Sequence, residues 1–222
     1  MKHFIDISNF ELKKLDSIIE KAKQIKNNPK KFSNKCKNKT LGMIFQKDST
    51  RTRASFTVGF QKLGGNTIEL NSKSIGFGKR ESIEDILRTL AQFIDVLVIR
   101  NDDHEILNKL SSLNALPIIN GLTDMSHPCQ IISDMLTINE KIGNIKKKQI
   151  TWVGDYNNVL RSLIELQILY KFKLNVVLPK EILKKNKTEI IKYNNKQLFF
   201  TNSLMDGIKY ADCVMTDAWV SM

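Results

Sequence analysis

Two kinds of apolar pattern alternate along the chain. In residues 5 to 27, apolar side chains recur every three or four positions, which predicts an amphipathic helix with Ser8 or Asn9 as its cap. Short runs of consecutive apolar residues instead predict strands. These runs lie at residues 41–45, 67–70, 95–100, 116–120 (ended by Gly121), 150–153, 175–178, 198–200 and 213–216.

Helical patterns lie between most of these strands. The predicted helices are residues 54–63, 83–94, 104–113, 128–143, 159–172, 180–193 and 204–211. The alternation runs once before and once after a lysine-rich link at residues 144–149. We therefore predict an α/β protein with two doubly wound parallel-sheet domains, at residues 1–143 and 144–222.

The composition agrees with a globular protein of this kind. The chain has 222 residues, of which 41% are hydrophobic and 26% charged, so it is long enough for two cores. No apolar run approaches the length of a membrane span, and we see no signal-peptide region at the N-terminus. The cysteines Cys36, Cys129 and Cys213 are isolated, which suggests no zinc site or disulfide framework. We expect a reducing, cytoplasmic setting.

The net charge of +12 raises the question of nucleic-acid binding. Lysines gather at residues 35–39, 146–148 and 184–187, without the interleaved aromatic residues that stack bases. The groups at 35–39 and 146–148 lie between predicted elements, where a charge run is usually solvated surface. A basic surface would also attract an anionic substrate. A basic nucleic-acid-binding module therefore remains only as an alternative hypothesis.

A polar turn follows the buried strand at residues 41–45 and precedes the helix at 54–63. It consists of Ser49, Thr50, Arg51, Thr52 and Arg53. A strand, a short loop and a helix start together aim free backbone N–H groups at an anion. Hydroxyls add donors, and a guanidinium adds a planar fork suited to phosphate or carboxylate. An ordinary N-cap followed by solvated arginines is the simpler alternative, but three hydroxyls interleaved with two arginines favour an anion site.

Further polar residues end other predicted elements. Arg100 ends the strand at 95–100, at the sheet edge where ligands bind, although it could equally extend into solvent. Pro128 suits the first position of a helix. His127 and Gln130, three residues apart, would meet at that helix start. A lone histidine there is more often a cap or packing residue, but the pair predicts donors to a carbonyl or phosphate oxygen.

The second half has polar residues at corresponding places. Asp155, Asn157 and Asn158 follow one predicted strand, and Asp217 follows another. These side chains could face the first domain across a cleft. The chain has no GxGxxG motif, so a dinucleotide is not indicated. The glycine-containing loop at residues 71–80 is either functional or a plain surface connection.

These motifs, in this order and over essentially the whole chain, resemble those of the aspartate/ornithine carbamoyltransferase family. Cys129 in the His-Pro-Cys-Gln form, the pair Asn157 and Asn158, and the Asp-x-Trp-x-Ser-Met ending are similar to the ornithine branch. Putrescine or modified-ornithine carbamoyltransferases are alternatives within the resemblance. The resemblance to the family implies a carbamoyltransferase-like fold, a homotrimer and no metal or organic cofactor.

The resemblance also implies roles for single residues. Arg51, Arg100 and His127 would be catalytic. Carbamoyl phosphate would be bound by Ser49, Thr50, Arg51, Thr52, Arg100, His127 and Gln130. L-Ornithine would be bound by Asn158, Asp217, Ser221 and Met222. Residues 1–143 would then be the carbamoyl-phosphate-binding domain and residues 144–222 the N-terminal part of the ornithine-binding domain. Residues 72–80 would reach a neighbouring subunit's site.

Four departures from the family pattern stand out. Asp48 replaces a common proline and would either act as a cap or weaken anion affinity. Tyr156 replaces a small residue, which would crowd the amino-acid side, and Arg161 stands where histidine is common. The sequence stops within the family's Ser-Met-Gly motif, so we expect the second domain to be incomplete. A catalytically silent remnant that still binds carbamoyl phosphate is therefore a further alternative.

Overall fold

The computed structural model describes residues 3–47, 49–71, 75, 81–193 and 196–217. Short 3-10 helices are present at Ile7–Asn9 (η1), Pro29–Phe32 (η2) and Ile145–Lys147 (η3). The other elements of the first half are α1 (Leu12–Asn27), β1 (Thr40–Phe45), α2 (Thr50–Lys62), β2 (Asn66–Asn71), α4 (Ile83–Leu90), β3 (Val96–Arg100), α5 (His104–Ser112), β4 (Ile118–Leu122) and α6 (Pro128–Lys141).

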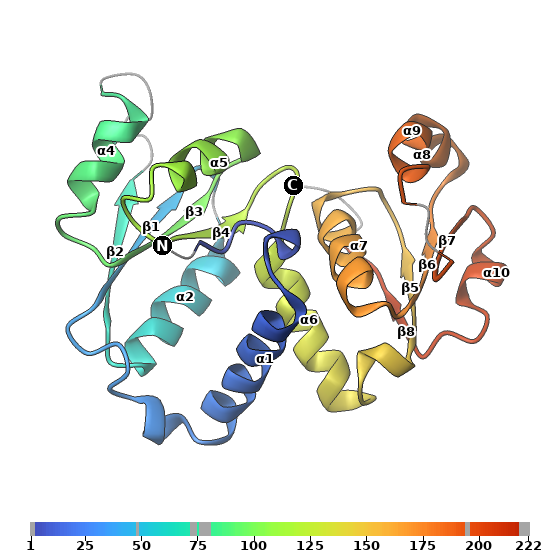
Figure 1. The fold of residues 1–222 in the computed structure, drawn as a ribbon, viewed down its shortest axis with the longest axis horizontal. Coiled ribbons are helices and arrows are strands. Elements are labelled where there is room, and N and C mark those ends of the chain that lie inside the picture. Colours follow the sequence, from blue (N-terminus) through green and yellow to red (C-terminus); the bar gives the residue numbers. More distant parts are fainter. Residues whose placement is uncertain (1–2, 48, 72–74, 76–80, 194–195, 218–222) are drawn as a thin grey trace.

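The second half has the same alternation of strands and helices. It comprises β5 (Gln149–Val153), α7 (Asn158–Tyr170), β6 (Lys173–Val177), α8 (Lys180–Lys185), α9 (Lys187–Ile190), β7 (Leu198–Thr201), α10 (Leu204–Ile208) and β8 (Cys213–Met215). The described strands form two parallel sheets of four, in the orders β2-β1-β3-β4 and β7-β6-β5-β8 (Figure 1). The predicted fold class is therefore confirmed.

Both faces of the first sheet are covered. Leu41, Met43 and Phe45 of β1 belong to a cluster with the aromatic residues of α2. Ile44, between them, belongs to the cluster that includes Leu107 of α5 and lies on the opposite face. This alternation is what a strand with a period of two residues produces when helices cover both faces. The carboxyl ends of β1, β3 and β4 are thereby held at one edge.

The core of the second half includes two helices from the first half. Leu15 of α1 and Met135 of α6 lie in one buried cluster with Trp152 of β5 and Leu163 of α7. In Figure 1, α1 and α6 stand between the two sheets. The hydroxyl of Tyr170 at the end of α7 also donates to a carboxylate oxygen of α1, at 2.7 Å. The two halves therefore share a hydrophobic core.

The N-terminal helix begins later than the sequence predicted. Neither Ser8 nor Asn9 caps it, because η1 forms first and α1 follows with Glu11 at its N-cap. The side chain of Asn9 accepts from the backbone N–H of Asp6, at 3.1 Å, and the N–H of Ser8 donates to Glu165 of α7. These local and tertiary bonds stabilise a separate turn.

Three other boundaries also differ. The predicted helix at 180–193 is two short helices, because the Asn186 side chain donates to the carbonyl of Ile182 and ends the first one. The helix that begins at Ile83 ends at Leu90. Gly121 lies inside β4 rather than ending it. A Cβ at this position would lie 3.2 Å from the carbonyl oxygen of Ile99 in β3, so the glycine permits a close approach of the two backbones. None of the described helices is long and apolar enough to span a bilayer.

Candidate active site

The β1–α2 turn and the end of β3 lie side by side. Phe45 of β1 pairs with Arg100 of β3 in the parallel register, so Arg100 lies next to the turn that starts α2. The Nη1 of Arg100 donates to Ser49 Oγ at 3.2 Å and to Thr52 Oγ1 at 3.4 Å. Ser49 Oγ also donates to Thr52 Oγ1, at 2.8 Å, and accepts from the backbone N–H of Thr52. Ser49 therefore is an N-cap, as the simpler alternative held, but the cap is bonded to a guanidinium.

Two polar atoms near this cluster lack a hydrogen bond within the described part of the chain. They are Arg100 Nε and His127 Nδ1, and both are buried. Most buried polar atoms in proteins are paired, so an unpaired one at a sheet edge indicates a place for a ligand or water. Because Arg100 is the last residue of β3 and His127 follows the adjacent strand β4, their unpaired atoms lie at the same sheet edge.

The electrostatics keep His127 neutral near pH 7. Burial, helped by the positive charge of Arg100, lowers the pKa of His127 to about 4, although Asp217 opposes the shift. Burial also lowers the pKa of Arg100; the Asp102 carboxylate opposes this shift, and the charge of Arg51 adds to it. A neutral imidazole and a charged guanidinium suit a site that binds an anion and polarises a carbonyl.

The remaining residues of the turn point in different directions. Thr50 and Arg51 are exposed in the first turn of α2. Arg53 pairs with Glu69 of β2, at 2.9 Å, and lies over the Phe45 ring. Arg53 is therefore engaged away from the Arg100 cluster, whereas Arg51 has an exposed side chain.

Gln130 is bonded within α6 in this structure. Its side-chain amide donates to Asp134, one turn further along α6, at 2.9 Å. The Gln130 amide is therefore engaged within its own helix, and its convergence with His127 stays a prediction. A rotation of the exposed Gln130 side chain would be needed for both to reach one oxygen atom.

Polar residues that follow strands of the second sheet lie near the loop that carries His127. Asn158 Nδ2 donates to the carbonyl of Thr123, at 2.5 Å, which links the start of α7 to the loop after β4. Asn157 Nδ2 donates to Asp217 Oδ2, at 2.6 Å. The structure therefore brings Asn158 and Asp217 to the edge that faces His127. Ser221 and Met222 lie outside the described residues, as do Asp48 and most of 72–80.

Sequence reasoning missed a buried serine that anchors His127. Ser162 of α7 is fully buried, and its Oγ accepts from the backbone N–H of His127 at 2.9 Å. It also shares a hydrogen bond with Ser126 Oγ, at 3.2 Å. The available signal was a serine inside an otherwise apolar helix. Buried hydroxyls are nearly always hydrogen-bonded, so such a serine indicates a polar partner nearby.

A second missed network holds the same loop from the other side. The Nδ1 of His104 lies 2.8 Å from Thr123 Oγ1, and its Nε2 lies 3.2 Å from Asp6 Oδ2. The hydrogen bond to Asp6 raises the pKa of His104. The loop that carries His127 is therefore held from the N-terminal segment as well as from α7.

Replacing Ser162 with alanine is expected to lower the free energy of unfolding by about 1–3 kcal/mol, because it leaves the backbone N–H of His127 without a partner and removes a bond from Ser126. Chemical denaturation measures this. Ser111→Ala is the matched control, since its exposed hydroxyl bonds only within α5, and we expect a change below about 0.5 kcal/mol. Equal effects of the two variants would contradict the anchoring role.

The depressed pKa of His127 predicts a pH dependence of stability. The folded protein binds this proton only near pH 4, whereas the unfolded chain binds it near pH 6.5, so stability falls as pH drops below 6.5. Between pH 7.5 and pH 5 the wild type should lose about 2 kcal/mol more than His127→Asn. Denaturation of both proteins at the two pH values measures the difference, in which other titrating groups largely cancel. Parallel losses would show that His127 titrates normally.

Two departures from the family pattern contact each other. The Arg161 guanidinium lies 4.7 Å from the centre of the Tyr156 ring and also pairs with Glu189 of α9. Tyr156 itself is buried in the core of the second half. The ring therefore packs into this core, and crowding of the amino-acid side stays a prediction.

No group of three or more His, Cys, Asp or Glu side chains in the described chain is arranged to hold a metal.

Comparison with known proteins agrees with this geometry. Residues 2–140 match the carbamoyl-P binding domain of aspartate/ornithine carbamoyltransferase, and residues 146–222 match its Asp/Orn binding domain. The ornithine carbamoyltransferase of Brucella ovis is 40% identical over 225 residues, covering 100% of this chain and 72% of that protein. That of Mesorhizobium japonicum is 39% identical and covers 100% and 74%.

Solved structures give the same result. Ornithine carbamoyltransferase from Burkholderia thailandensis superposes with a TM-score of 0.89 at 30% identity, over 99% of this chain and 76% of that one. The enzyme from Pyrococcus furiosus gives 0.87 at 32% identity, over 99% and 72%. With both domain matches and this identity over its whole length, the chain belongs to the aspartate/ornithine carbamoyltransferase family.

Proposed function

We propose that this protein transfers the carbamoyl group of carbamoyl phosphate to the side-chain amine of L-ornithine, giving citrulline and phosphate in arginine synthesis. One observation carries the proposal: Arg100 Nε and His127 Nδ1 are buried and unpaired at the sheet edge beside the Ser49–Thr52 turn. The names of the relatives support ornithine as the acceptor.

The phosphate side of the reaction would use the β1–α2 turn. Ser49, Thr50, Arg51 and Thr52 would bind the phosphate through hydroxyls, the guanidinium and the N–H groups at the start of α2. The exposed Arg51 can meet the phosphate as it enters. As the bond between the carbamoyl carbon and the phosphate oxygen breaks, the same groups would stabilise the departing phosphate.

The carbamoyl side would use the unpaired atoms. Arg100 and His127, with Gln130 after a side-chain rotation, would donate to the carbonyl oxygen, on which negative charge develops in the tetrahedral transition state. The neutral amine of ornithine would form the new C–N bond and release a proton. Asn158, Asp217, Ser221 and Met222 would hold its amino-acid end. Fixing both reactants supplies much of the remaining acceleration, without a metal or cofactor.

The assembly proposed here is a cytoplasmic homotrimer. Residues 1–143 would bind carbamoyl phosphate, 144–222 would bind ornithine, and residues 72–80 would complete a neighbour's site. An exposed apolar surface at the edge of the first sheet supports contact between copies. Helix α2 has no buried residue, and Val58 on α2 and Ile68 on β2 are 47% and 43% exposed.

Calorimetric titration of the 222-residue chain with carbamoyl phosphate, followed by a citrulline assay with ornithine, tests the proposal. We expect saturable binding and citrulline formation, with putrescine as a poorer acceptor in the parallel assay. Binding without turnover would instead favour the catalytically silent remnant. Faster turnover of putrescine would reassign the acceptor. No binding by the folded chain would overturn the site assignment.

A further inference from the structure

A hollow of about 390 Å³ lies at the amino edge of the second sheet, opposite the proposed active site. Gln149 and Lys173 are the first residues of β5 and β6, while Gln197 and Asp212 directly precede β7 and β8. Its volume is within the range of about 300–1,000 Å³ typical of ligand pockets. Nothing in the proposed reaction uses this edge of the sheet.

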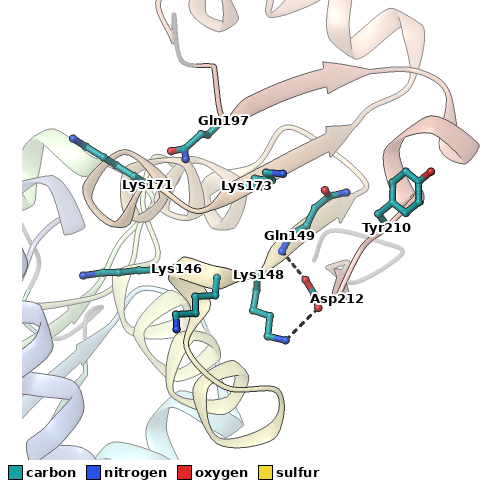
Figure 2. Close-up of a pocket in the computed structure, with 9 residues that line it drawn as sticks. Lys146, Lys148, Gln149, Lys171, Lys173, Gln197, Tyr210 and Asp212 are labelled. Atoms are coloured by element: carbon teal, nitrogen blue, oxygen red, sulfur yellow. Dashed lines mark hydrogen bonds and ion pairs between the residues drawn. The ribbon is translucent and has the colours of Figure 1, made fainter.

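The hollow is strongly basic. Among the nine described residues that line it, five are lysines and one is acidic, a formal charge of +4. Lys146 and Lys148 border it on one side and Lys171 and Lys173 on the other (Figure 2). The carboxylate of Asp212 is already engaged, because it accepts from Lys148 Nζ at 3.2 Å and from the backbone N–H of Gln149 at 2.8 Å. Most of the lysine charge is therefore not balanced within the hollow.

Two lining residues have unusual backbone conformations. Lys171 has φ 55° at the end of α7, and Tyr210 has φ 65°. Left-handed conformations favour glycine, and their use by larger side chains concentrates at functional sites. A charged side chain, that of Lys171, thus occupies a position where glycine would relieve backbone strain. The Tyr210 ring is 80% exposed and lies 5.2 Å from the Lys209 ammonium.

We propose that this hollow binds a compact polyanion with a chain of two or more phosphates, either inorganic or attached to a nucleoside. Several lysines can each contact a different phosphate oxygen, because ammonium groups act as adaptable point charges. The exposed Tyr210 ring at the rim would be available to stack on a base if the phosphates belong to a nucleotide.

Titration with inorganic triphosphate at low salt tests the proposal. We expect saturable single-site binding that weakens as NaCl is added and persists in Arg51→Ala, which excludes binding at the proposed active site. The double variant Lys171→Gly/Lys173→Gln should weaken binding roughly tenfold. Glycine suits the left-handed position, so this variant should fold at least as well as the wild type.

The matched control is Lys184→Gln/Lys185→Gln on α8, which removes the same charge beyond the opposite edge of the sheet. It should change the affinity less than twofold. Equal weakening by both double variants, or no saturable binding, would overturn the proposal. ATP then separates the two sources: tighter binding than triphosphate, reduced by Tyr210→Ser, identifies a nucleotide, and equal binding identifies the phosphate chain alone.

Discussion

Replacing Arg100 with glutamine is expected to lower kcat/KM for carbamoyl transfer by about 10²–10³-fold. In the free protein the guanidinium bonds both Ser49 and Thr52, and its buried Nε has no partner. We expect this donor to reach the carbonyl oxygen where charge develops, so the loss should fall mainly on kcat. Steady-state kinetics with saturating ornithine measures it.

Arg53→Gln is the matched control for this experiment. It removes the same charge from the neighbouring turn, but Arg53 pairs with Glu69 and lies over Phe45. Loss of such a partly exposed ion pair costs only about 0.2–1 kcal/mol of stability, so the variant should remain folded. Because Arg53 is engaged away from the Arg100 cluster, kcat/KM should stay within about threefold of wild type. A similar loss in both variants would point to a general effect of charge, and full activity of Arg100→Gln would remove Arg100 from the site.

Replacing Leu15 with alanine is expected to lower the free energy of unfolding by about 2–5 kcal/mol. Leu15 is fully buried in α1, within the core cluster that contains Trp152 and Leu163 of the second half. Both tryptophans of the chain, Trp152 and Trp219, lie in that half. Denaturation followed by tryptophan fluorescence therefore reports whether a change in α1 destabilises the second sheet.

Leu107→Ala provides the comparison for Leu15→Ala. Leu107 is equally buried, but it lies in the cluster between the first sheet, α4 and α5. We expect its effect on the fluorescence-detected transition to be smaller than that of Leu15→Ala. An unchanged fluorescence midpoint in Leu15→Ala would mean that the second half unfolds independently of α1, contrary to a shared core.

The fold was largely predictable because its signals are local. Runs such as residues 41–45 and 150–153 are too short and apolar for surface helices, and the strand–helix alternation implies parallel sheets. The misplaced boundaries have tertiary or side-chain causes. Ser8 bonds to Glu165, which lies far away in the sequence, and Asn186 bonds back to Ile182. Periodicity contains no information about such bonds.

The site was predictable in part. Residues at the carboxyl ends of strands can be placed at one edge from topology alone, and the structure brings Arg100 to Ser49 and Thr52 as that reasoning implies. Side-chain direction was not predictable, since Gln130 turns to Asp134. Nor was the support from Ser162, whose partners His127 and Ser126 are more than 30 residues away along the chain.

The core that α1 shares with α6 and α7 has a consequence for synthesis on the ribosome. The apolar face of α1 is complete once residue 27 is made, but α7 ends only at residue 170. At about 5–20 residues per second, this face waits roughly 7–29 s until α7 is complete. During that interval the nascent chain exposes the apolar face of α1, which is a surface that a chaperone can bind. The first helix to be translated is thus among the last to be covered.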